Sequence, residues 1–136
     1  MAATGIKDLG DFTVTAAGTQ VGTPVTGLDG MTAATLQLRL AYGSGGTTVR
    51  AYVQTSLDQG TTWIDLACVL FGTASEVAVL NFSGLTPKTT AAVPTDGAMT
   101  DDTAVDGILG DRLRVKVVST GTYAGSTVLS ARASVR

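Results

Sequence analysis

Hydrophobic and polar residues alternate with a period of two along most of the chain, which is typical of β-strands that bury one face. The clearest run is 36–42, where Leu and Tyr alternate with Gln, Arg and Ala. A second run, 49–54, follows the glycine-rich segment 43–46, whose composition favours a tight turn. We therefore predict that these two runs form a β-hairpin.

Further runs extend this pattern across the chain. Residues 63–71 are apolar at nearly every position apart from Asp65, which predicts a strand covered on both faces. Strands are also predicted over 75–82, 112–117 and 129–136, with weaker candidates at 12–15 and 21–26. No segment has a convincing helical period. The sequence thus predicts an all-β fold, a single antiparallel β-sandwich or jelly-roll-like domain over 1–136 with about seven or eight strands.

Two segments lie outside this pattern. The long loop 83–110 is the longest gap between predicted strands and contains two prolines and several Thr, Ala and Asp residues. Compact domains rarely keep such a loop without a use, so we predict that it contacts a partner; the alternative is a solvated surface loop. Residues 1–11 are predicted to form an N-terminal arm on a neighbour, or otherwise a frayed terminus.

The segment 56–63, with the sequence SLDQGTTW, fits the pattern S-x-D-x-G-x-T-W at its fixed positions Ser56, Asp58, Gly60, Thr62 and Trp63. Asp58 can accept backbone hydrogen bonds in a turn, Gly60 permits a positive φ, and Trp63 can cover the turn. The segment resembles the Asp-box, a β-hairpin turn found in sialidases and in many unrelated β proteins. We expect it to join the strands on either side. Sialidase activity is not expected, because one such turn in a short chain cannot build a propeller.

The composition excludes several classes of function. The chain has 136 residues, a formal net charge of −2, 15% charged residues, no histidine and one cysteine. Histidine-dependent catalytic triads and His- or Cys-rich metal sites are therefore excluded. A negative net charge argues against general nucleic-acid binding, and the apolar runs are too short to span a membrane. We expect no enzymatic activity, no cofactor, no metal, and neither nucleic acid nor membrane as a partner.

The few charged residues are segregated along the chain. Acidic residues gather at the end of the long loop, and basic residues lie on the last two predicted strands. If those strands pair, one sheet face gathers five cations, including Arg136. We predict that this charge separation helps to pack neighbouring subunits, through Asp96, Asp101, Asp102, Asp106, Arg112, Arg114, Lys116 and Arg132. The alternatives are an ordinary solvated sheet face and, for the acidic loop with Asp111, a calcium site.

Other residues suggest chemistry only by their type. Asp65 and Glu76 lie on adjacent predicted strands, as a glycosidase acid pair requires, but nothing in the pattern selects them. Cys68 lies inside an apolar strand and is expected to be a core residue. Four aromatic residues could stack a sugar, although they are scattered along the sequence: Tyr42, Tyr52, Trp63 and Tyr123.

The chain as a whole resembles the small virion proteins of tailed bacteriophages. The shared features are low charge, the lack of histidine, many Ala, Gly and Thr residues, and the all-β pattern. The resemblance covers roughly 32–136 and includes SLDQGTTW leading into WIDLACVLF, GDRLRVKV at 110–117, and TGTY at 120–123 before the final strand. Within that class, the chain most resembles capsid decoration and minor capsid proteins. The resemblance assigns a function to no individual residue.

This resemblance implies a non-enzymatic protein that binds and stabilises the outer capsid shell. The implied partners are the major capsid protein and further copies of the chain, as a homotrimer or another homo-oligomer. The implied location is the capsid exterior, after synthesis in the host cytoplasm. Two alternatives stay open. One is a tail or fibre component, or a β-sandwich module that binds a glycan or receptor; the other is a hydrolase.

Overall fold

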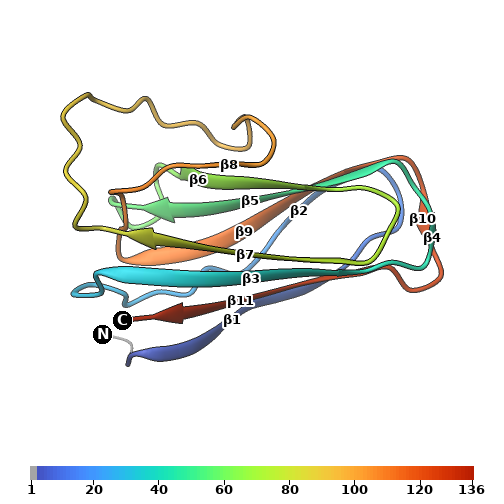
Figure 1. Ribbon diagram of the computed structural model, residues 1–136, viewed down its shortest axis with the longest axis horizontal. Helices are drawn as coiled ribbons and strands as arrows, with labels where there is room; N and C mark the ends of the chain where they lie inside the picture. The colour runs from blue at the N-terminus through green and yellow to red at the C-terminus, as the bar shows by residue number, and fades with distance from the viewer. Residues whose placement is uncertain (1–2) are drawn as a thin grey trace.

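The computed structural model describes residues 3–136, which form two antiparallel β-sheets packed face to face (Figure 1). The predicted all-β sandwich-like fold is confirmed, and the described residues contain no helix. Accordingly, residues 3–136 contain no helix that could span a membrane. The strands are β1 (Gly5–Thr13), β2 (Gly18–Val21), β3 (Ala33–Ala41), β4 (Ser44–Gly45), β5 (Thr48–Ser56), β6 (Ile64–Phe71), β7 (Glu76–Ser83), β8 (Thr103–Ala104), β9 (Arg112–Thr120), β10 (Tyr123–Ala124) and β11 (Val128–Val135).

The chain passes from one sheet to the other at most of its connections. Sheet A has the strand order β1-β11-β3-β7, and sheet B has the order β2-β9-β5-β6-β8. The short strands β4 and β10 pair with each other at the end of the sandwich opposite the two chain ends (Figure 1). Across the described residues, β5 and β6 are the one pair of consecutive strands that hydrogen-bond to each other.

Two predicted strand pairings are wrong for the same reason. Strands β3 and β5 contain the runs 36–42 and 49–54, yet they lie in different sheets, because segment 43–46 carries the chain across the sandwich. The last long strands, β9 and β11, are also in different sheets, so their basic side chains do not share a face. Each of these strands hydrogen-bonds to other strands of its own sheet and contributes its inward apolar side chains to the core between the two sheets.

The predicted N-terminal arm is also corrected, because from Gly5 onward the segment is strand β1 of sheet A. It pairs with β11 from Gly5 opposite Val135 to Thr13 opposite Val128, with a bulge between Asp8 and Gly10. Leu9 and Phe12 are buried in the core, which explains why the segment is held in the sheet. Met1 and Ala2 lie outside the described residues.

The weaker strand candidates are partly confirmed. The candidate 12–15 overlaps only the last two residues of β1, and the candidate 21–26 overlaps only the end of β2, which lies at an edge of sheet B. Strand β2 stops at Val21, before Pro24, because proline cannot donate to a ladder. Val25 makes only an isolated bridge with Leu113.

The core lies between the sheets and is made of aliphatic side chains from the long strands of both. The inward side chains of β3, Leu36, Leu38 and Leu40, are buried, as are those of β9 and β11. The prediction that 63–71 is covered on both faces is confirmed, since six of eight residues of β6 are buried. Part of the long loop covers the outer face of β6.

Two glycine-rich crossovers pack against each other at the end of the sandwich. The amide of Gly46 donates to the carbonyl of Thr122 at 2.7 Å, and Tyr123 packs its ring against Gly46 and edge-on to Tyr42 at 6.1 Å. A side chain at Gly43 would overlap the carbonyl oxygens of the facing crossover, at Gly125 and its neighbour. Glycine is therefore required here by the close approach of two backbones.

We expect Gly43→Ala to lower the free energy of unfolding by about 1–3 kcal/mol, since the facing backbone must move to admit a methyl group. Urea denaturation would measure the loss. Gly72→Ala is the matched control, because no atom lies within 4 Å of a Cβ added at Gly72. Equal stability of the two variants would contradict the close packing of the crossovers.

Candidate functional site

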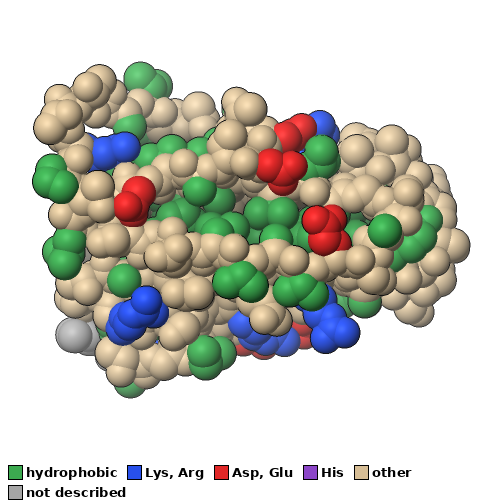
Figure 2. All heavy atoms as spheres, in the orientation of Figure 1, with side chains coloured by type: hydrophobic (Ala, Val, Ile, Leu, Met, Phe, Trp, Pro, Cys, Tyr) green, Lys and Arg blue, Asp and Glu red, His purple; other side chains and the backbone are tan. Residues whose placement is uncertain are grey.

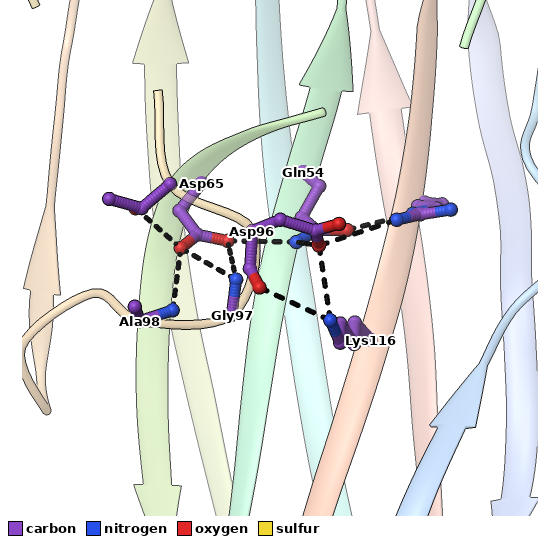
Figure 3. Close-up of polar contacts among 8 residues, drawn as sticks. Gln54, Asp65, Asp96, Gly97, Ala98 and Lys116 are labelled. Carbon is purple, nitrogen blue, oxygen red and sulfur yellow. Dashed lines mark hydrogen bonds and ion pairs between the residues drawn. The ribbon is translucent and has the colours of Figure 1, made fainter. Parts of the chain in front are cut away.

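The second half of the long loop lies against the outer face of sheet B. Residues 95–102 contact side chains of β5, β6 and β9 through a polar network (Figure 3). The loop then pairs with β6 as β8, where Ala104 is opposite Ala67. The loop is thus part of the domain rather than a free excursion, and its contacts are the first candidate for a site.

Asp65 is the centre of this network. It is 5% exposed, and its carboxylate accepts hydrogen bonds from four donor groups (Figure 3). Gln54 Nε2 donates at 2.8 Å, Thr95 Oγ1 at 2.7 Å, and the amides of Gly97 and Ala98 at 2.9 and 3.0 Å. A carboxylate occupied in this way anchors the loop and is not available to transfer a proton to a substrate.

Gln54 connects Asp65 to the charges beside it. Its buried side-chain nitrogen also donates to Asp96 Oδ1 at 2.7 Å, and its oxygen accepts from Arg114 Nε at 2.7 Å. Asp96 forms ion pairs with Lys116 at 3.2 Å and Arg114 at 3.5 Å. Each hydrogen-bonding atom of the amide is therefore used, so the network specifies one arrangement of the loop.

The electrostatics of the network follow from this geometry. Burial opposes ionisation of Asp96, but hydrogen bonds from Gln54 and Lys116 and the nearby positive charges outweigh it, so its pKa is lowered. Burial lowers the pKa of Arg114 despite the attraction of Asp96. The guanidinium carbon of Arg114 lies 3.9 Å from the centroid of the Trp63 ring, a cation–π contact that further holds it.

The other loop aspartates are also engaged by the chain. Asp101 accepts two hydrogen bonds from Arg50, at 2.7 and 3.1 Å. Asp102 accepts from the Leu70 amide at 3.0 Å. Asp106 accepts from the Ser83 amide at 2.6 Å. These contacts fix successive turns of the loop onto β5, β6 and the end of β7.

The residues predicted to pack subunits are therefore found in contacts within one chain. Asp96 is brought together with Arg114 and Lys116, whereas Arg132 is on sheet A and pairs with Asp8 at 2.9 Å. Arg112 pairs with Asp111 beside it, at 3.1 Å. No group of three His, Cys, Asp or Glu residues that could hold a metal ion occurs in the described part of the chain.

The turn 56–63 joins β5 to β6, so the predicted hairpin at this position is confirmed. Asp58 Oδ1 accepts from the Thr62 amide at 2.7 Å, and Ser56 Oγ accepts from the Gly60 amide at 2.8 Å. The Thr62 amide is the main cause of the lowered pKa of Asp58. Gly60 has a positive φ of 91°. Trp63 lies beside Gly60, and Arg114 covers its ring.

The residues of the other candidate sites do not come together in the structure. Asp65 and Glu76 do not form an acid pair, because β6 and β7 lie in different sheets and Asp65 is bound by the loop. Cys68 is buried under the loop, and burial together with Asp101 raises its pKa to about 11. The four aromatic residues do not form a common platform, since Tyr52 and Tyr123 are buried.

Sequence reasoning missed a surface on the outer face of sheet A. Three aliphatic side chains are exposed there, Ile6 by 71%, Val79 by 65% and Val77 by 54%. A shallow groove of about 230 Å³ runs between Ile6 and Val79, over side chains of β3 and β11. The available signal was the run 77–80, which is apolar on both faces of the predicted strand 75–82.

The sequence matches no protein-family model, and comparisons with curated proteins and with solved structures also find no significant match.

We expect Asp65→Ala to destabilise the protein by about 3 kcal/mol, because buried donors of Gln54, Gly97 and Ala98 lose their acceptor. Urea denaturation would give the stability, and hydrogen exchange at the amides of Gly97 and Ala98 should become faster. Thr89→Ala, in the exposed first half of the loop, is the control and should change neither quantity. Unchanged exchange at these amides in Asp65→Ala would contradict the anchoring role.

Acidification should also loosen the loop. Hydrogen bonds from Arg50 lower the pKa of Asp101, and the Ser83 amide lowers that of Asp106, in addition to the lowered pKa of Asp96. Because these folded-state values lie below the unfolded value near 3.9, the stabilisation is complete above about pH 5 and is lost as the pH falls below about 4.

Urea denaturation between pH 2 and pH 7 would measure this loss. Asp96→Asn should flatten the decline, whereas Asp29→Asn, at an exposed position outside the loop, should leave it unchanged. The same acid slope in wild type and Asp96→Asn would show that the loop contacts do not contribute.

Proposed function

We propose that the protein is a non-enzymatic structural component of a tailed-bacteriophage virion that binds the outer capsid shell and stabilises it. The proposal begins with the resemblance of the sequence to small virion proteins. It is supported by the acidic residues under the loop, because Asp65, Asp96 and Asp101 each form hydrogen bonds or ion pairs with other residues of the chain. Such groups favour a role in binding over a role in acid–base chemistry.

The observation that carries the proposal is the uncovered outer face of sheet A. The outer face of sheet B is covered in part by the long loop, but Ile6, Val77 and Val79 of sheet A remain exposed around the groove. Exposed apolar patches rimmed by polar residues are typical of protein–protein contact sites. The outer face of sheet A is therefore the proposed contact surface for the major capsid protein.

One group of charges on the same face, around Arg132, suits burial against a partner. Arg132 pairs with Asp8 at 2.9 Å and with Asp11 at 3.2 Å. Charges already paired on the surface cost less to desolvate than isolated ones. Further copies of the chain are the second proposed partner, as the resemblance to capsid decoration proteins implies.

The test is co-sedimentation with purified capsids of the encoding phage and the temperature at which those capsids open. We expect the protein to pellet with capsids and to raise that temperature. Ile6→Asp should weaken capsid binding by about tenfold or more, since burial of an isoleucine contributes about 1.5–3 kcal/mol. Leu57→Asp is the matched control, because Leu57 is 69% exposed on the turn 56–63, away from sheet A.

Two outcomes would overturn the proposed function, and a third would reject the proposed contact face. The protein could bind tails and leave capsids untouched, which would favour a tail or fibre component. It could bind a glycan and no particle, which would favour a receptor-binding module. Equal capsid binding by Ile6→Asp and the wild type would reject the sheet A face as the contact surface.

A further inference from the structure

Strand β7 is an outer edge of sheet A and, within 3–136, pairs only with β3. Just beyond its end, the Gly84 amide donates to the Thr32 carbonyl at 2.7 Å, in the register that pairs Ser83 with Ala33. Hydrogen bonding alternates along an antiparallel ladder, so the even-numbered residues of β7 bond β3. The odd-numbered residues therefore turn their N–H and C=O groups outward, away from the sheet.

The loop caps only one end of this edge. The Ser83 amide donates to Asp106 at 2.6 Å, and the Ser83 carbonyl accepts from the Gly107 amide at 2.9 Å. For the amides of Val77, Val79 and Asn81, no acceptor is found anywhere in 3–136. Three successive outward-facing residues of β7 therefore have backbone amides without a hydrogen-bond partner within 3–136.

Strand β7 has little of the usual protection of sheet edges. Edge strands avoid association through proline, charged residues or a bulge, and of these β7 has only Glu76, at its first position. By contrast β1, the other edge of sheet A, has Lys7 and a bulge between Asp8 and Gly10. An edge with so little protection is suited to accept a further strand.

An apolar groove lies directly beside this edge. It has a volume of about 210 Å³ and lies between β7 and strands β6 and β8. Hydrophobic side chains are visible in the hollow between these strands (Figure 2). Its lining residues are Cys68, Val69, Ala78, Leu80, Asp102, Thr103 and Ala104. Because one water occupies about 30 Å³ in the liquid, the groove has room for aliphatic side chains.

The charged residues at this edge indicate which kind of segment would bind there. Asp102 lines the groove and Glu76 begins β7, and neither forms an ion pair with any residue in 3–136. They differ in this from Asp96 and Asp101, which have basic partners in the chain. Two unpaired carboxylates favour lysine or arginine in the occupant, and they repel a second copy that carries the same carboxylates.

We infer that β7 binds an extended segment of a partner protein by strand addition, and that this segment has small or aliphatic residues flanked by lysine or arginine. Its backbone pairs with Val77, Val79 and Asn81. Alternate side chains cover the groove, and the others lie beside the exposed valines. This inference stands whether or not the partner is a capsid protein.

Val79→Pro tests the backbone contact. Proline at this position removes an outward N–H and places its ring in the path of an added strand, but leaves the bonds from β7 to β3 in place. Val79→Thr is the matched control, because threonine keeps the N–H and suits a strand. Circular dichroism and urea denaturation would verify that both variants are folded.

The probe is an acetylated and amidated peptide with the sequence Lys-Val-Ala-Val-Ala-Val-Lys, compared with the same peptide carrying glutamate in place of lysine. NMR titration would give the affinity and the amide exchange. We expect the lysine peptide to slow exchange at Val77, Val79 and Asn81. Binding should be weaker by about tenfold for the glutamate peptide, for Val79→Pro, and for a double variant with Glu76→Gln and Asp102→Asn, but not for Val79→Thr.

Other results would overturn the inference. These are unchanged exchange at the three amides with saturating lysine peptide, or equal binding by Val79→Pro and wild type. Self-association of the protein that Val79→Pro abolishes would assign the edge to a second copy instead. A protein that binds the lysine peptide but not capsids would reject the proposed function while leaving the edge site in place.

Discussion

The buried carboxylate of Asp65 is the interaction on which the outer face of sheet B depends. A charge at this depth is tolerated only when hydrogen bonds replace its hydration, and here the donors come from Gln54 and from three loop residues, Thr95, Gly97 and Ala98. The loop must therefore close over β5 and β6 for the carboxylate to be stable. The burial of both faces of these strands follows from that closure, as does the position of Asp96 beside Arg114 and Lys116.

The strands were predictable from the sequence, but most of their pairings were not. A period of two and the turn 56–63 are local signals, and they gave the strand positions and the β5–β6 hairpin. Segment 43–46 looks the same whether the chain folds back or crosses to the other sheet, so the neighbours of β3 were mispredicted. Most of strand β1 was missed because the bulge at Asp8 and Gly10 breaks its period, and only its end was predicted, within the candidate 12–15.

In the candidate sites, too, some features were visible in the sequence and others depended on the strand order. The separation of acidic and basic residues is visible in the sequence, but their partners are set by which strands share a sheet. The role of Asp65 had no local signal, because its donors include backbone amides more than thirty positions away. The open edge of β7 was hidden for a different reason. An apolar strand at an edge and one in the middle of a sheet have similar sequences, and only the strand order separates them.

The position of β11 between β1 and β3 sets the order in which sheet A can be completed. Until residues 128–135 have been synthesised, the two earlier strands share no partner, and β1 has no other strand of sheet A to pair with. Closing such distant pairings is slow, and unpaired apolar strands are prone to aggregate meanwhile. The earliest-made strand of the domain is thus paired late, and it carries Lys7, Asp8 and Asp11, charged residues of the kind that discourage association of unpaired strands.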